Sequence, residues 1–284
     1  MPAVTLSGRA FVTITGTDAE DFLQALITTD LAALPQREAR AGALLTPQGK
    51  ILFDFLVFRL PGGGLCLETT GSQSDALVKR LTMYKLRAQV TIATTGETEA
   101  TVSWDGEGDD DGEAITDNRF ARAGRKVLRR PGVGGNAAAS AYDALRVDCG
   151  IVESGIDYAL SDAFPHDVLL DLSGGLSFRK GCYVGQEVVS RMQHRSTARR
   201  RPVIVEARAA LPPSGTEIVA EGKTIGTLGT VAGERGLAIV RIDRVAEAQR
   251  AGAPILAGAV DVTVRLPEWT GLSFPEESAG TPAQ

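Results

Sequence analysis

The sequence has few of the residues that bind metals or form disulfides. Its 284 residues include three cysteines, Cys66, Cys149 and Cys182, and two histidines, His166 and His194. The cysteines lie far apart and form no CxxC or CxxH pair. Their odd number argues against a disulfide framework and favours a reducing compartment. A cluster that needs four cysteine ligands cannot be built from one such chain. Any iron-sulfur role must therefore be indirect, shared between chains or completed by other ligands, and we expect no resident metal site.

Long apolar runs and excess positive charge are also absent. No apolar run approaches the ~18 residues that suggest a membrane span. The N-terminal stretch MPAVTLSGRAFVTITG has the pattern of a strand and lacks a charged leader followed by an apolar block. The formal net charge is -5 and the pI is about 5.3, which argues against a broad nucleic-acid surface. We expect a soluble, cytoplasmic protein that contacts no membrane.

The composition is that of a globular protein with two or three domains. Hydrophobic residues make up 43% of the chain and charged residues 23%, and domains typically have roughly 100–150 residues. The turn residues 47–50 (PQGK) separate two strand-like runs. Apolar spacing predicts helices over residues 18–34 and 74–86, and strands within 43–60, 66–69 and 89–93.

Two breaks interrupt the chain before its last third. The acidic, Gly-rich run at residues 105–113 (DGEGDDDGE) predicts an exposed loop. Residues 129–141 (RRPGVGGNAAASA) predict a hinge that precedes a strand at 145–147.

The end of the chain has a different pattern. From residue 199 onward, short apolar or alternating pieces are separated by Gly-rich turns, and Glu221-Gly222 is a hairpin signal. This pattern predicts a small β-barrel or sandwich. Residues 273–284 are small and polar and predict a disordered tail.

Residues 179–187 (RKGCYVGQE) contain the most informative cysteine. Cys182 lies just before a predicted helix, and two cations, Arg179 and Lys180, lie on its N-terminal side. The helix dipole and both charges would favour the thiolate form. A small cysteine packed under the helix fits the same local sequence equally well. For Cys66, which lies in an apolar strand context, and for Cys149, which follows Leu145-Arg146-Val147-Asp148, we predict core packing.

Residues 180–187 (KGCYVGQE) match the K-G-C-Y-x-G-Q-E hallmark of the YgfZ-type folate-binding proteins, and the chain resembles this family. Its mitochondrial members serve iron-sulfur cluster maturation. These proteins look like the T-protein of glycine cleavage, a folate-dependent aminomethyltransferase. Three further blocks agree in order, so that the resemblance covers about residues 4–270: 16–23, 43–54 and 145–165.

The resemblance implies an α+β fold, a three-domain T-protein-like ring with folate in its central opening. A discontinuous folate-binding domain would use residues 1–43 and 140–195. A ferredoxin-like domain would cover 44–139, and a C-terminal β-barrel domain 199–270. Residues 271–284 would form the tail.

The resemblance also implies roles for two separate residues. Asp54 would lie near the reacting folate nitrogen, where a carboxylate can relay a proton. The alternative is an aspartate at the edge of an apolar strand. Arg146 would lie against folate, where a guanidinium can stack on a pterin or pair with a glutamate tail. Its alternative is an ion pair with a nearby carboxylate such as Asp148.

The resemblance implies two catalytic residues, Cys182 in the hallmark segment and Asp54 outside it. Lys180, Tyr183 and Gln186 would contribute to binding the cofactor, tetrahydrofolate or a one-carbon derivative. The T-protein block G-Y-T-G-E, whose glutamate holds the pterin, has no counterpart here. Residues 117–125 instead resemble the YgfZ-type D-x-R…G-x-R pattern.

The functional hypothesis that follows is a folate-binding accessory protein for assembly or repair of iron-sulfur enzymes, including tRNA-modifying ones. Its partners would be iron-sulfur enzymes or cluster-assembly proteins, and the resemblance favours an accessory role without independent turnover. The first alternative is a tetrahydrofolate-dependent aminomethyltransferase or methyltransferase. The second is a binding scaffold in which Cys182 is structural.

Overall fold

The computed structural model describes residues 2–106, 114–195 and 198–276. The chain divides into two compact units. Unit 1 comprises Met1–Tyr142, Leu160–Pro165 and Leu169–Arg195, and unit 2 comprises Asp143–Ala159, His166–Val168 and Ser196–Gln284. The predicted three-way division of the chain stays a prediction.

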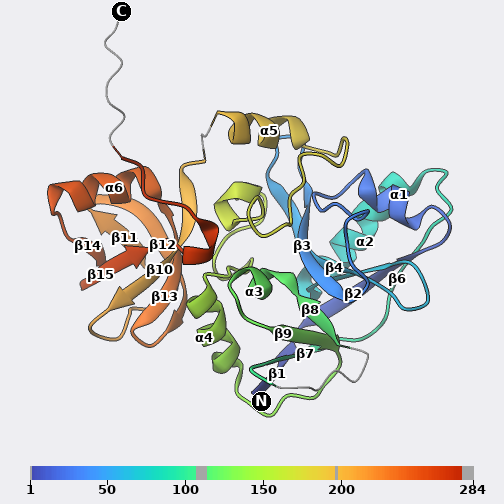
Figure 1. Cartoon of the computed structure of the whole chain (residues 1–284), viewed down its shortest axis with the longest axis horizontal. Helices are drawn as coiled ribbons and strands as arrows, with labels where there is room; N and C mark the ends of the chain where they lie inside the picture. Colours follow the sequence, from blue (N-terminus) through green and yellow to red (C-terminus); the bar gives the residue numbers. More distant parts are fainter. Residues whose placement is uncertain (1, 107–113, 196–197, 277–284) are drawn as a thin grey trace, which may run out of the picture. The chain divides into compact units, whose positions relative to one another are not determined.

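Unit 1 is built on a nine-stranded sheet in the order β1-β7-β9-β8-β3-β4-β5-β2-β6 (Figure 1). The pair β3–β8 is parallel and the other pairs are antiparallel. The strands are β1 (Ala3–Ser7), β2 (Arg9–Thr15), β3 (Glu38–Leu45), β4 (Ile51–Arg59), β5 (Leu65–Thr70), β6 (Thr91–Thr94), β7 (Glu99–Trp104), β8 (Ile115–Asp117) and β9 (Val127–Pro131). The helices that belong to unit 1 are α1 (Ala19–Gln24), α2 (Gly71–Lys85), α3 (Asn118–Arg122) and α5 (Gln186–His194).

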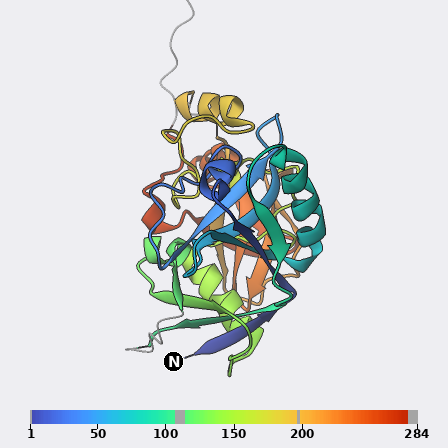
Figure 2. The same ribbon diagram turned by 90° about the vertical axis from the view of Figure 1, so that its right-hand side faces the viewer.

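Two helices cover one face of this sheet. Leu23 of α1 and Leu77 and Leu81 of α2 belong to the same buried cluster as Phe53 and Phe55 of β4. Figure 2 shows α2 running along the outer side of the sheet. Because side chains alternate along a strand, the Asp54 side chain points away from this apolar cluster.

Unit 2 contains a closed barrel with its own core. Its strands follow the order β10-β13-β12-β11-β14-β15, and its buried residues form a separate apolar cluster. The barrel elements are β10 (Arg200–Ala207), β11 (Glu217–Ala220), β12 (Lys223–Ala232), β13 (Arg235–Arg241), α6 (Ile242–Ala251), β14 (Ile255–Ala257) and β15 (Val260–Arg265). The helix α4 (Ala139–Cys149) runs from unit 1 into unit 2, and the short 3-10 turns are Pro165–Val168 and Glu268–Thr270.

Several predicted elements are confirmed. Residues 47–49 form the turn between β3 and β4, and the predicted helix at 74–86 is α2. Glu221 and Gly222 both have positive φ and join β11 to β12. The predicted barrel or sandwich is a closed barrel.

Two predicted elements are wrong. The helix expected over 18–34 ends at Gln24, because the side-chain hydroxyls of Thr28 and Thr29 bond to the backbone of β3 and of Gly175 instead of continuing a helix. The strand expected at 145–147 is part of α4. There Tyr142, Leu145 and Cys149 are buried at helical spacing, which outweighs the local β-like pattern.

Two further helices, α3 and α6, were not predicted. The acidic run 105–113 and the tail 273–284 fall largely outside the described residues, at 107–113 and 277–284. No helix among the residues described is long and apolar enough to cross a membrane.

Candidate functional site

The thiol of Cys182 is exposed, and residues on both sides of it are fixed to unit 1. Gly181, directly before it, has a φ of 98°, a backbone conformation that residues other than glycine rarely adopt. The space around Gly181 is open, because a Cβ built there would meet nothing within 4 Å. The local sequence left burial and exposure equally open, and the structure exposes the thiol. The loop therefore presents Cys182 to solvent.

Lys180 fixes this loop on its N-terminal side. Its Nζ donates to the carbonyl oxygens of Ile27 at 2.6 Å and Thr29 at 2.8 Å. Burial lowers the pKa of Lys180 to about 8, and nearby Asp30 partly offsets that effect. The same nitrogen lies 5.4 Å from the centre of the Tyr183 ring. Lys180 thus joins the cysteine loop to the segment that follows α1.

The C-terminal side of the loop is fixed by Tyr183, Gly185 and Gln186. The Tyr183 ring is buried, and burial raises the pKa of its phenol. Gly185 is the N-cap of α5 with a φ of 80°, and a Cβ there would lie 2.5 Å from the carbonyl oxygen of Thr46. The side chain of Gln186 accepts from the Tyr183 backbone N–H at 3.3 Å. These contacts seat the start of α5 on the β3–β4 turn.

The other two cysteines are buried, as predicted. Burial raises the pKa of the Cys66 thiol to about 12, and the Glu68 carboxylate adds to that effect. Cys149 ends α4, and its carbonyl accepts from the Trp269 indole N–H at 2.8 Å. Cys182 is therefore the thiol that a partner or reagent can reach. No group of three or more His, Cys, Asp or Glu side chains within the described residues could hold a metal ion.

Asp54 is half-buried on β4, and Gln73 of α2 orients its carboxylate. Gln73 Nε2 donates to Asp54 Oδ1 at 2.8 Å, and the Asp54 N–H donates back to Gln73 Oε1 at 3.3 Å. Asp54 pairs across the sheet with Ala43, whose N–H and carbonyl both bond to Thr28. In sequence, Thr28 lies between Ile27 and Thr29, whose carbonyl oxygens accept from Lys180. Asp54 and the cysteine loop are thus connected through one short segment of unit 1.

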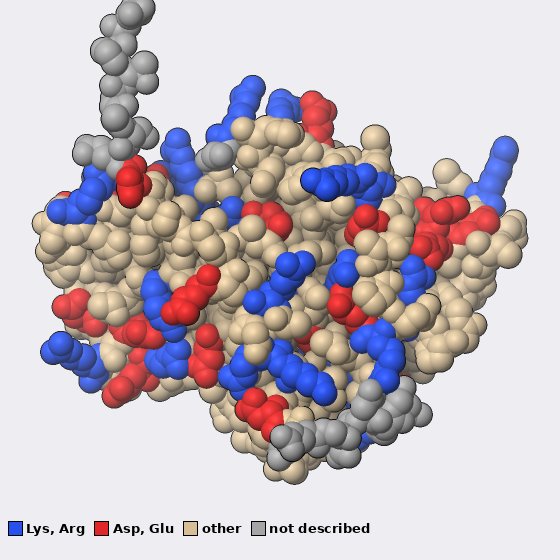
Figure 3. Space-filling view, viewed as in Figure 1, with Lys and Arg blue, Asp and Glu red and all other residues tan. Residues whose placement is uncertain are grey.

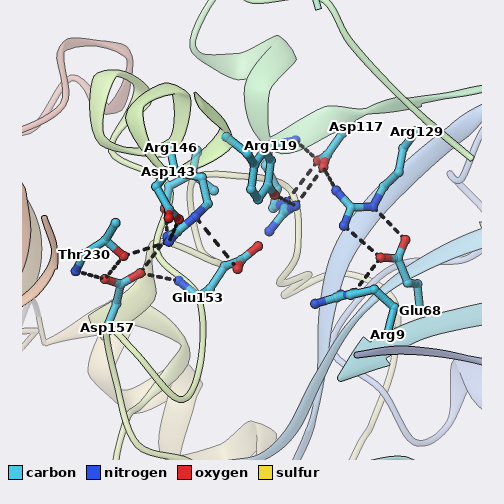
Figure 4. Close-up of polar contacts among 12 residues, drawn as sticks. Arg9, Glu68, Asp117, Arg119, Arg129, Asp143, Arg146, Glu153, Asp157 and Thr230 are labelled. Atoms are coloured by element: carbon cyan, nitrogen blue, oxygen red, sulfur yellow. Dashed lines mark hydrogen bonds and ion pairs between the residues drawn. The ribbon is translucent and has the colours of Figure 1, made fainter. Parts of the chain in front are cut away.

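Figure 4 shows a buried ionic cluster around Glu68, Arg129 and Asp117. The strand register places Glu68 on the same face of the sheet as Asp54. Glu68 of β5 is opposite Leu56 of β4, so Glu68 and Asp54 are diagonal neighbours, roughly 7–8 Å apart at their backbones. Glu68 accepts from Arg129 at 2.6 and 2.8 Å and from Arg9 at 2.9 Å. Burial alone would raise the pKa of Glu68, but the two guanidinium groups lower it to about 2.

The cluster continues to α3. Asp117 accepts from Arg119 at 2.7 and 3.0 Å and from Arg129 at 3.4 Å. Arg119 also donates to the Tyr142 hydroxyl at 3.3 Å. Sequence reasoning noted the D-x-R pattern at 117–119 but missed this cluster. The available signal was the single charge of Glu68 within the otherwise uncharged strand β5.

Arg146 lies in unit 2 and is only 1% exposed. Its terminal nitrogens donate to acceptors of the same unit: Asp143 at 2.9 Å, Ile151 at 3.1 Å, Asp157 at 2.8 Å and Thr230 at 2.7 Å. The ion-pair alternative therefore describes its contacts, with Asp143 and Asp157 as partners, while Asp148 pairs with Arg235. Contact between Arg146 and folate stays a prediction.

Comparison with known proteins gives the family. The family described as "CAF17, C-terminal beta-barrel domain" matches residues 199–272. The mitochondrial iron-sulfur cluster assembly factor IBA57 of Mus musculus is 31% identical over 277 residues, which cover 84% of this chain and 77% of the mouse protein. The chain belongs to the IBA57 family. The human IBA57 is 30% identical over the same shares, and the Coccidioides immitis homologue is 28% identical over 88% of this chain and 73% of that protein.

The fold is that of the glycine-cleavage T-protein, as predicted. The crystal structure of the glycine cleavage system aminomethyltransferase T from Bartonella henselae superposes with a TM-score of 0.71. The match covers 94% of this chain and 86% of the Bartonella chain. The sequence identity of 14% is low, so this likeness shows the fold alone.

The predicted cytoplasmic location is contradicted by these relatives. The IBA57 factors from mouse, Coccidioides immitis and Chaetomium globosum are all named as mitochondrial proteins. The prediction rested on composition and on the absence of a leader pattern, and neither of these distinguishes one reducing compartment from another.

Proposed function

We propose that this chain is an accessory protein of iron-sulfur cluster assembly or repair that acts through Cys182. The observation that supports this best is the presentation of the thiol. Cys182 is exposed, while Lys180, Tyr183 and Gln186 beside it are used to hold the loop. The family to which the chain belongs consists of iron-sulfur cluster assembly factors.

An exposed, positioned thiol can supply one ligand to a cluster that a partner protein carries. A thiolate is a strong iron ligand, but a whole cluster needs about four such ligands. Two of the three cysteines are buried, so the remaining ligands would come from the partner. The proposed partners are cluster-assembly proteins and the iron-sulfur enzymes that receive clusters, including tRNA-modifying enzymes as in the YgfZ type.

We further propose that tetrahydrofolate or a one-carbon derivative binds at Asp54. The residues fit this group, because a half-buried carboxylate held in one orientation by Gln73 can accept a hydrogen bond from a ring nitrogen. Lys180, Tyr183 and Gln186 would support this site by fixing the cysteine loop. Lys180 holds the loop to residues 27–29, and Thr28 in that segment bonds to Ala43, the cross-strand neighbour of Asp54. When bound, the folate would supply one-carbon chemistry.

Complementation of cells that lack this protein tests the role of the Cys182 thiol. We expect the wild-type gene to restore the activities of several iron-sulfur enzymes and Cys182→Ser to restore little of them at matched protein level. Cys66→Ser is the matched control, because it replaces a buried thiol in the same unit and should retain function wherever it folds. Full restoration by Cys182→Ser would refute the proposed role of the thiol.

Thermal unfolding tests folate binding. Folate at 100 times its dissociation constant should stabilise the chain by about 2.7 kcal/mol. Asp54→Asn should reduce this gain without a large loss of stability, because the amide oxygen can still accept from Gln73. The absence of any shift at millimolar folate would contradict this part of the proposal.

The alternative function is a tetrahydrofolate-dependent aminomethyltransferase. The T-protein-like fold and the position of Asp54 favour it. Release of ammonia from an aminomethyl donor upon addition of tetrahydrofolate, abolished by Asp54→Asn, would establish it over the accessory role.

A further inference from the structure

The charge around Cys182 is opposite in sign to the charge of the chain as a whole. Residues 179–195 contain four Lys or Arg residues and one Glu, whereas the whole chain has a net charge of -5. Lys180 is occupied by the carbonyls of Ile27 and Thr29. Arg179, Arg191 and Arg195 are exposed. Figure 3 shows Lys or Arg side chains projecting from the edge of unit 1 where α5 lies.

These three arginines are available to a partner. The side chains of Arg179 and Arg195 make no hydrogen bond or ion pair with the described residues. Arg191 donates to Glu187 at 2.8 Å, but the two side chains are 59% and 83% exposed. An exposed pair of this kind is weak and exchanges readily with another carboxylate.

The helix α5 and its C-cap present two of these charges, Arg191 and Arg195, on one side. It is anchored on its other side, where Val189 is buried and a Cβ at Gly49 of the β3–β4 turn would lie only 3.0 Å from Val188. Glu187, Arg191 and Arg195 follow one another at a spacing of four residues, which places them on one stripe of the helix. Cys182 lies only four residues before the first residue of α5, so a partner that reaches the thiol also meets this stripe.

We propose that residues 179–195 form a docking surface for an acidic face of the partner protein. The surface is short, since the nine residues of α5 span about 14 Å. It also contains one negative charge, Glu187. A nucleic acid would favour a longer basic stripe on a chain without excess negative charge. A few carboxylates on the surface of a protein could pair with the three arginines one to one over this short distance. This inference takes the class of partner, a cluster-assembly protein, from the proposed function.

The test compares two doubly substituted chains that change the net charge equally. Arg191→Glu with Arg195→Glu reverses the helix stripe. Arg208→Glu with Lys223→Glu, at two exposed positions of unit 2, is the control. Circular dichroism and thermal unfolding establish that both chains are folded. The probes are a fluorescent peptide of Glu-Gly repeats and a fluorescent single-stranded oligonucleotide of equal charge, each titrated at low and at high NaCl.

We expect the peptide to bind the wild-type and control chains and to bind the helix variant about tenfold more weakly, with the difference reduced by salt. In cells, the helix variant should restore less iron-sulfur enzyme activity than the control. Equal peptide binding by the two variants would overturn the inference. Tighter binding of the oligonucleotide through the same arginines would also overturn it. If the wild-type chain restores no enzyme activity, the proposed function fails while the peptide titration still decides whether the surface exists.

Discussion

The residues of the cysteine loop differ sharply in what they do. Lys180, Tyr183, Gly185 and Gln186 contact other parts of unit 1, whereas Cys182 between them makes its side chain available to solvent. A structural cysteine needs no such support, because burial alone holds a small apolar side chain. The loop therefore has the form expected when the thiol itself is used.

The reactivity of the thiols in the native chain follows from this difference. We expect a thiol reagent to modify one cysteine per native chain and three after denaturation, because burial raises the pKa of Cys66 to about 12 and encloses Cys149. The absorbance of the released chromophore measures this number. Cys182→Ser should reduce the native value to zero, and a native value above one would contradict the assignment.

Lys180 gives a pH-dependent contribution to stability. Burial lowers its pKa from 10.5 in the unfolded chain to about 8 in the native chain. Between these values the unfolded chain binds more protons, so the free energy of unfolding should rise with pH across this window. Below pH 8 or so, Lys180 is charged in the native chain, and its buried charge lowers the free energy of unfolding by the full amount.

Urea unfolding across that window tests this contribution. Lys180→Met should lack the rise, and it should also be less stable than wild type at high pH, because the carbonyls of Ile27 and Thr29 lose a donor. Lys79→Met, at an exposed position of α2, is the control and should keep the wild-type slope. A Lys180→Met chain with an unchanged slope would show that the buried amine does not titrate in this way.

At the scale of elements, one side chain connects three strands. Glu68 of β5 accepts from Arg9 of β2 and from Arg129 of β9. These strands are not all neighbours in the sheet order. The buried carboxylate therefore adds a link across the sheet that the strand hydrogen bonds do not supply, and it does so beside Asp54.

Removing this carboxylate should destabilise the chain strongly. Glu68→Gln leaves the buried Arg129 with only the more distant Asp117 as a charge partner, and we expect a loss of about 3–5 kcal/mol in the free energy of unfolding. Because the native pKa of Glu68 is about 2 and its ordinary value is 4.5, the contribution is present above pH 4.5 and is lost as the pH falls toward 2. Urea unfolding at several acidic pH values measures both effects. Glu234→Gln, at an exposed turn, should change neither.

At the scale of the whole molecule, each unit has its own core and its own buried ionic network. In unit 2, Asp157 accepts from Arg146 and also from the backbone N–H and hydroxyl of Thr230 on β12. This carboxylate joins residues 143–159 to the barrel. Unit 2 is therefore more than the matched barrel segment 199–272.

Asp157→Ala should accordingly destabilise unit 2 by about 3–5 kcal/mol, because Arg146 stays buried with one carboxylate fewer. Trp269 reports on unit 2 in a Trp104→Phe background, so its fluorescence during urea unfolding measures the loss. Asp261→Ala, at an exposed position of β15, is the control. An unchanged midpoint for Asp157→Ala would show that this network contributes little to the stability of unit 2.

The sequence by itself was sufficient for features that depend on neighbouring residues. The turn at 47–49, the Glu221-Gly222 hairpin and the helix at 74–86 follow from turn chemistry and apolar spacing, and the structure confirms them. The resemblance carried by the K-G-C-Y-x-G-Q-E segment predicted the T-protein-like fold and an iron-sulfur assembly family, while the IBA57 family itself came from the comparison with known proteins. The burial of Cys66 and Cys149 was also predicted, for Cys66 from its apolar strand context.

Only the tertiary structure decided the features that depend on distant residues. Cys182 is exposed because its loop is fixed by Ile27, Thr29 and Thr46, more than a hundred positions away in sequence. Arg146 is occupied because Thr230 and the 151–157 segment reach it, and the chain at 145–147 is helical because α4 buries one face. Periodicity and turn residues report local backbone preference, whereas exposure and ion pairing are set by whichever side chains the fold brings alongside.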